Sequence, residues 1–175
     1  EGAEGALTLG EGRWQNVVDE QSEAVALAEA IGANQALASL GLYKNDIDEE
    51  GAAAIGNMLR VNGTLKILSL SKNKIGDAGA AAISDGLRVN GALMSLDINS
   101  NSIGPTGSAA IGEALKINGA LTSLDISSNH PGIGTEGAKA IADALRVNGA
   151  LTDLSLAGDW LGPEAAHPIA EPLPA

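Results

Sequence analysis

One nine-residue pattern returns along this chain at a nearly constant interval. Residues 93–101 read L-x-x-L-x-I-x-x-N, and equivalent segments begin at residues 37, 65, 121 and 151. Their starts are 28 residues apart, except for the last interval of 30, where two residues are added near His130-Pro131-Gly132. A fixed period of this length predicts a solenoid, in which each unit packs on its neighbours and all units share one continuous core.

Each repeat changes from strand-like to helix-like spacing. Residues 68–70 (Leu-Ser-Leu) alternate between apolar and polar, which is typical of a half-buried strand. Further on, Gly107, Ile111 and Leu115 recur at the spacing of one helix face, and we expect the glycine to let the helix lie close to the sheet. The predicted unit is therefore β-turn-α, with parallel strands on one side of the solenoid and helices on the other.

The helix ends carry signals of their own. Acidic residues or proline open the helical stretches, and a base closes each of four of them. An Asn-Gly pair follows each base, and it predicts a left-handed turn that ends the helix. The bases are Arg60, Arg88, Lys116 and Arg146, and the pairs are residues 62–63, 90–91, 118–119 and 148–149.

An asparagine closes the strand-like segment in four repeats. These are Asn45, Asn73, Asn101 and Asn129. The backbone must turn away from the sheet at this point, which leaves polar groups that no sheet hydrogen bond can satisfy. A buried amide can both donate and accept there, so we predict a structural ladder of asparagines.

The repeats define three parts of the chain. Residues 1–36 are expected to form an irregular first repeat, residues 37–150 four regular repeats, and residues 151–175 a degenerate last repeat that acts as a cap. Trp14 is expected to cover one end of the core, and Trp160 the other. Prolines at 168, 172 and 174 are expected to shorten or break the last helix.

Composition excludes several classes of function. The net charge is −12, which argues against nucleic-acid binding, and the acidic surface is either simply solvated or attracts a basic partner. No apolar stretch is long enough to span a membrane. The chain has no cysteine, which favours an intracellular, cytoplasmic setting. Because it begins with Glu1, removal of a leader for an organelle and origin in a longer protein both stay open.

The pattern L-x-x-L-x-L-x-x-N-x-I-G-x-x-G-x-x-x-I-x-x-x-L-x-x-N matches almost completely at residues 65–90 and 93–118. In this the chain resembles leucine-rich-repeat proteins of the ribonuclease-inhibitor type. It is similar to the sensor repeats of nucleotide-binding immune-receptor-like proteins and to the repeat domain of Ran GTPase-activating proteins. The resemblance implies an α/β leucine-rich-repeat solenoid, a short horseshoe arc with parallel strands on the concave face and helices on the convex face. It implies almost nothing about activity.

No catalytic arrangement emerges from the residue types. The two histidines, His130 and His167, belong to different repeats, and no triad spacing is found. Asp97, Asp125 and Asp153 are expected to stand in a row on the concave sheet, either as a solvated acidic stripe or, less favoured, as oxygen ligands for a divalent cation. We therefore predict no enzyme activity, no metal and no cofactor.

Departures from the repeat indicate where a protein partner could bind. On the concave side an aromatic, an apolar and two basic residues interrupt a surface of small polar residues. They are Tyr43, Lys44, Ile67 and Lys72, and Asp97 and Asp125 extend the same face. A second candidate patch combines His130 and Pro131 of the insertion with Trp160, although these residues could equally form a self-packed corner.

These features predict a non-catalytic protein-binding module. The partner would bind through the concave sheet and the adjoining strand-to-helix loops. One alternative is a structural subunit of a larger assembly, which would suit a small alanine-rich solenoid. The other is a regulator of a small GTPase, which the Ran-related resemblance suggests and which predicts saturable stimulation of GTP hydrolysis.

Overall fold

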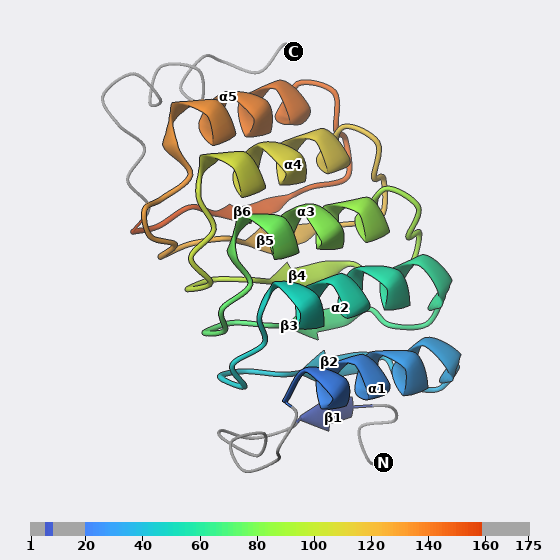
Figure 1. Ribbon diagram of the computed structural model, residues 1–175. Coiled ribbons are helices and arrows are strands. Elements are labelled where there is room, and N and C mark those ends of the chain that lie inside the picture. Colours follow the sequence, from blue (N-terminus) through green and yellow to red (C-terminus); the bar gives the residue numbers. More distant parts are fainter. Residues whose placement is uncertain (1–5, 9–19, 159–175) are drawn as a thin grey trace.

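The computed structural model describes residues 6–8 and 20–158 as one repeating α/β arrangement (Figure 1). Strands and helices alternate along the whole of this part, in the order β1 Ala6–Thr8, α1 Glu20–Ala33, β2 Ser39–Gly41, α2 Glu49–Val61, β3 Ile67–Ser69, α3 Gly76–Leu87, β4 Ser95–Asp97, α4 Pro105–Leu115, β5 Ser123–Asp125, α5 Gly134–Leu145 and β6 Asp153–Ser155. The strands form one parallel sheet whose order follows the chain, from β1 to β6.

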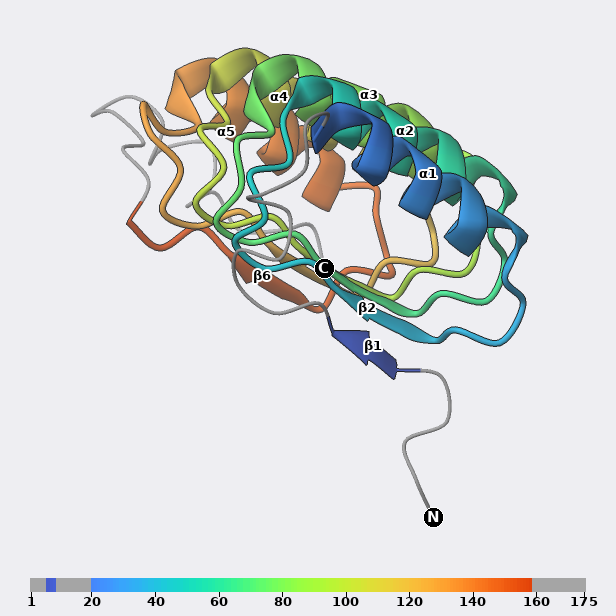
Figure 2. The ribbon, with the colours of Figure 1, turned by 60° about the horizontal axis from the view of Figure 1, so that its bottom comes forward.

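Helices and strands form two separate layers. All helices lie on one face of the sheet, and the other face is left uncovered by them (Figures 1 and 2). The register advances by one repeat at each step, with Leu68 beside Leu96 and Leu96 beside Leu124. The predicted α/β solenoid arc, with strands on one side and helices on the other, is confirmed.

Aliphatic side chains from equivalent positions fill the space between the layers. The middle residue of each strand points inward, so that Leu68, Leu96 and Leu124 are at most 1% exposed. Isoleucines of the helices, such as Ile83 and Ile111, meet them from the other side and are fully buried. Burial of several large apolar side chains in every repeat, at about 1.5–3 kcal/mol each, is the main stabilising contribution.

Glycines set the distance between neighbouring helices. A Cβ atom on Gly86 of α3 would lie 2.4 Å from the carbonyl oxygen of Gly56 in α2, so the two helix backbones touch. A Cβ atom on Gly79 would lie 2.7 Å from Cβ of Ala52, also in α2. The expectation that the stripe glycine, such as Gly107, brings a helix close to the sheet was incomplete, because a Cβ atom on Gly107 would also meet Asp77 of the preceding helix.

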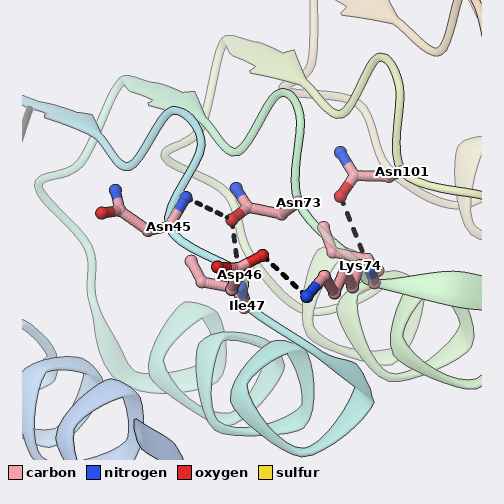
Figure 3. A network of polar contacts seen from close by, with 7 residues as sticks. Asn45, Asp46, Ile47, Asn73, Lys74 and Asn101 are labelled. Atoms are coloured by element: carbon pink, nitrogen blue, oxygen red, sulfur yellow. Dashed lines mark hydrogen bonds and ion pairs between the residues drawn. The ribbon is translucent and has the colours of Figure 1, made fainter. Parts of the chain in front are cut away.

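Buried asparagines fasten strand-to-helix turns to the repeat before them (Figure 3). The side-chain oxygen of Asn73 accepts hydrogen bonds from the backbone N–H groups of Asn45 and Ile47, at 2.9 and 3.0 Å. Its amide nitrogen donates to the carbonyl oxygens of Leu42 and Leu70, at 2.9 and 2.8 Å. Asn129, two repeats further along the chain, makes equivalent bonds.

The Asn-Gly pairs at the helix ends behave differently from the prediction. The positive φ angles of the described residues do not fall on Gly63, Gly91, Gly119 or Gly149. Instead each asparagine of the pair ties its loop to the preceding repeat. Asn118, for example, donates to the carbonyl oxygens of Leu87 and Asn90, at 2.7 and 2.9 Å, and accepts from the N–H groups of its own loop. The left-handed stop was wrong because side-chain hydrogen bonds, not glycine geometry, shape this turn.

Candidate functional site

Outward-facing strand residues form two rows across the concave face. Side chains alternate along a strand, so the first and third residues of each short strand share this face. Strand register then aligns them across the sheet. The first row is Ser39, Ile67, Ser95, Ser123 and Asp153, and the second is Gly41, Ser69, Asp97, Asp125 and Ser155.

This register corrects the expected row of three acids. Asp97 and Asp125 are neighbours, but the next residue in their row is Ser155. Asp153 pairs with Ser123 in the other row. A shift of two residues keeps a side chain on the same face of the sheet but moves it along the strand, so Asp153 shares the face and not the row.

Hydroxyl and amide groups of neighbouring residues hold the carboxylates of Asp97 and Asp153 on the β4–β6 half of the concave face. Ser69 Oγ donates to Asp97 Oδ2 at 3.0 Å, and Asn99 Nδ2 donates to Asp97 Oδ1 at 2.6 Å. Ser123 Oγ donates to Asp153 Oδ2 at 3.1 Å. Within the described residues no three His, Cys, Asp or Glu side chains are grouped so that they could hold a metal ion.

The other half of the concave face carries an aromatic–cation pair. Lys72 Nζ donates to Tyr43 OH at 3.0 Å and lies 5.3 Å from the centre of the tyrosine ring. The two residues come from successive repeats, so the contact needs the solenoid to be assembled. Ile67, the first residue of β3, presents a side chain that is about half exposed, at 49%. Lys44 is exposed directly after Tyr43.

Charge therefore divides along the concave side. Lys44 and Lys72 lie near β2 and β3, whereas the three aspartates lie on β4, β5 and β6. A further base, Lys74, forms an exposed ion pair with Asp46 at 2.8 Å (Figure 3). The repeats thus present a surface that is basic toward one end and acidic toward the other.

Comparison with known proteins matches this geometry to one repeat family. The model of the family described as "Leucine Rich repeat" matches residues 61–84, 92–112 and 120–142, which coincide with successive β-α units. This is a leucine-rich-repeat protein. Its 28-residue β-α repeat is consistent with the ribonuclease-inhibitor type.

Two solved structures share the fold of this leucine-rich-repeat protein over most of its length. One is described as "Leiomodin-1 Actin-Binding Site 2 (ABS2)", with 24% identity, a TM-score of 0.71, and coverage of 88% of each chain. The other is the tropomodulin C-terminal domain of Caenorhabditis elegans, with 14% identity, a TM-score of 0.68, and coverage of 86% of this chain and 89% of that one. No curated protein matches the sequence. The described part of the chain contains no helix that could cross a membrane.

The second patch predicted for this leucine-rich-repeat protein falls partly outside the described residues. His130 and Pro131 are exposed in the loop before α5, where the two additional residues are accommodated without a change of sheet register. Trp160 lies beyond residue 158, as do the prolines of the last segment, and Trp14 lies between the described ranges. The structure therefore places two of the three residues of this patch.

A second set of structural asparagines lies in the helix-to-strand loops, and its role was not predicted. The asparagines there form a second ladder on the opposite edge of the sheet from the first. The signal was present in the sequence as a recurrent Val-Asn-Gly or Ile-Asn-Gly, but it was interpreted only as a helix stop. The four asparagines are Asn62, Asn90, Asn118 and Asn148.

Proposed function

We propose that this chain is a non-catalytic protein-binding module that uses its concave sheet and the adjoining strand-to-helix loops. The observation that carries the proposal is the contact between Tyr43 and Lys72, together with the exposed side chain of Ile67 on the same face. Aromatic and basic side chains with adjacent apolar surface are the types that dominate binding energy at protein interfaces. Here they interrupt a face otherwise built from small polar residues.

The pairing of Tyr43 with Lys72 also supports this role. A tyrosine ring already held by a neighbouring ammonium group loses less side-chain freedom when a partner covers it. The same contact fixes the position of a positive charge beside an apolar surface. A partner that carries an acidic group next to an apolar anchor would match this end of the concave face, and a basic segment would match Asp97 and Asp125.

Actin is the first partner to test. The leiomodin structure that shares this fold is described as an actin-binding site. Fold likeness at that level of identity does not transfer a partner, so the choice rests on a direct measurement with monomeric and filamentous actin.

The experiment compares three forms of the chain as bait for proteins of its native source and for purified actin. They are the unchanged chain, Tyr43→Ala combined with Ile67→Ser, and Lys139→Ala, which alters an exposed residue of α5 on the convex side. We expect a partner to be retained by the first and third forms. It should bind the double variant at least about tenfold more weakly.

Two outcomes would contradict the proposal. Equal retention of every partner by the double variant would remove the concave face from the interaction. Isolation of the chain only as a stoichiometric subunit, with aggregation once it is separated, would favour the structural-subunit alternative. Light scattering of the purified chain distinguishes that case from a free monomer.

A further inference from the structure

A row of exposed β-branched residues runs along the edge where the helices end, away from the concave face. Val61, Val89, Ile117 and Val147 occupy the same position in four successive repeats. They are 69%, 64%, 61% and 68% exposed, more than any other large apolar residue among those described. Each directly follows the base that ends its helix. The loops that lead from the helices into the next strands lie along the right-hand side of the view in Figure 1.

We define the helix-end edge as residues 60–66, 88–94, 116–122 and 146–152. Its four segments contain five bases, Arg60, Lys66, Arg88, Lys116 and Arg146, and no acid. This is unusual in a chain with a net charge of −12. The edge therefore combines an apolar row with a basic row beside it.

The bases of this edge can exchange their ion-pair partners within the chain for carboxylates of another protein. Arg88, Lys116 and Arg146 each form an ion pair with an acid three residues earlier on the same helix, and their side chains remain 39%, 32% and 41% exposed. Exposed pairs of this kind contribute only about 0–1 kcal/mol, so a carboxylate of a partner can replace the internal one at little cost. The residue at the corresponding position before Arg60 is Asn57, which is uncharged.

Four glycines of the same edge have no explanation within the chain. A Cβ atom on Gly63, Gly91, Gly119 or Gly149 would meet nothing within 4 Å, and none of these residues has a positive φ. Any residue would fit there. Glycine in all four repeats leaves open space beside the apolar row, as is needed where another backbone approaches closely.

The spacing of the row suits a helix. Packed helices lie about 8–10 Å apart, and this sets the interval between successive members of the row. Residues seven apart on one α-helix are about 10 Å apart along its axis and lie nearly on the same face. A helix with apolar residues at every seventh position, over about 20 residues, would therefore reach all four members.

From these observations we infer that the helix-end edge binds an acidic amphipathic helix of a partner protein. Apolar residues of that helix would cover Val61, Val89, Ile117 and Val147, and its carboxylates would face the five bases. The overall charge of −12 repels an extended anionic surface such as a bilayer or nucleic acid, whereas a single helix meets mainly the local bases of the edge, because salt screens charges more than about 10 Å away. This surface is separate from the concave face, so it provides a second contact.

The test uses a synthetic helical peptide with leucine at every seventh position and glutamate on either side of the leucines. Binding is measured by fluorescence titration with the full chain. A peptide with lysine in place of glutamate, and one with the leucines scattered, serve as controls. We expect the acidic peptide alone to bind, and amide NMR signals of the four glycines of the edge to shift when it does.

Variants locate the site. Val89→Ser combined with Ile117→Ser, and separately Arg88→Glu combined with Lys116→Glu, should each weaken the peptide about tenfold or more. The altered residues are exposed, and thermal unfolding followed by circular dichroism checks that both variants fold as the parent does. Tyr43→Ala should leave peptide affinity unchanged, which separates this proposal from that for the concave face.

Several results would overturn the inference. One is binding of the lysine peptide as tightly as the glutamate peptide; another is no binding of either. A dimer of the chain itself that Val89→Ser with Ile117→Ser dissolves would assign the edge to self-association. Binding to vesicles of phosphatidylcholine and phosphatidylserine in place of the peptide would assign it to a membrane.

Discussion

The two edges of the solenoid solve the same hydrogen-bonding problem in different ways. At the edge where helices start, Asn101 donates to the carbonyl oxygen of Leu70 in the preceding repeat, at 2.9 Å. At the edge where helices end, Asn118 donates to the carbonyl oxygen of Leu87, at 2.7 Å. In both cases a buried amide satisfies backbone groups that the short strands leave unpaired. Each edge is thereby locked to the repeat before it.

The edges differ in backbone geometry and in charge. At the helix-start edge Lys44, Lys72, Ser100 and Ser128 adopt left-handed conformations, at φ of 54° to 57°. That edge also accommodates the longer loop at His130 and Pro131. The helix-end edge, by contrast, repeats almost the same residues in every unit and carries bases without acids. The core thus lies between one edge whose residues vary and one whose residues repeat. Because the fold does not need all of the repeated residues, their uniformity supports the partner-binding role inferred for the helix-end edge.

The largest expected effect tests whether the two ladders are equivalent. Asn101→Leu and Asn118→Leu should each lower the free energy of unfolding by about 1–3 kcal/mol, because buried backbone groups lose their partners. Chemical denaturation of the two variants measures this directly. Asn57→Leu, an exposed asparagine of α2, is the matched control and should change little. A loss confined to Asn101→Leu would show that only the helix-start edge depends on its asparagines.

Backbone geometry gives the next effect. Ser100→Val should lower the free energy of unfolding by about 1–2 kcal/mol, because a β-branched residue is strained at the positive φ of this position. Ser100→Gly removes the hydroxyl group without strain at this φ, and it therefore separates strain from loss of polarity. Equal thermal stability of Ser100→Val and the parent would argue against the left-handed turn.

A smaller effect concerns a carboxylate that joins two helix starts. Asp77 Oδ1 of α3 accepts hydrogen bonds from the N–H groups of Gly104 and Gly107 at the start of α4, at 2.6 and 2.9 Å. Asp77→Ala should therefore cost about 1 kcal/mol, as does loss of a helix cap. Asp85→Ala, which removes only an exposed pair with Arg88 near the helix end, should change stability by at most about 0.5 kcal/mol. Thermal melts of the two variants should differ in that order.

The smallest effect on stability is expected at the helix-end edge. Gly91→Ala meets open space and should leave the free energy of unfolding unchanged or raise it by about 0.5 kcal/mol, because alanine restricts the unfolded chain. Gly86→Ala in the same repeat is the contrast, since its Cβ atom would lie 2.4 Å from a backbone oxygen and should be clearly destabilising. A destabilised Gly91→Ala would mean that this glycine serves the fold after all.

The sequence predicted the fold because the repeat states the same pattern several times. Leu96, Ile98 and Ile111 recur at fixed positions, and a solenoid is the arrangement that lets such units share one core. The position of a single residue within its repeat was predicted less accurately. Asp153 was placed in the row of Asp97 because both point outward, although the aligned repeats already put Asp153 at the third position and Asp97 at the fifth.

Some contacts between repeats could not be predicted from the sequence pattern. Nothing in the spacing of Tyr43 and Lys72 indicates that the lysine reaches the tyrosine hydroxyl, because that contact depends on how a long side chain bends back across the concave face. Likewise Asn-Gly after a helix has a familiar meaning as a stop signal. The structure shows the asparagine alone shaping the turn, and this leaves its glycine without a role in folding.

Both ladders point the same way along the chain, and this gives assembly of the protein a direction. The amides of Asn73 and Asn101, and those of Asn90 and Asn118, donate to carbonyl oxygens of the repeat already preceding them. During synthesis a new repeat thus meets its acceptors in residues that left the ribosome earlier. We therefore expect each completed repeat to act as a template for the next while the chain is being made.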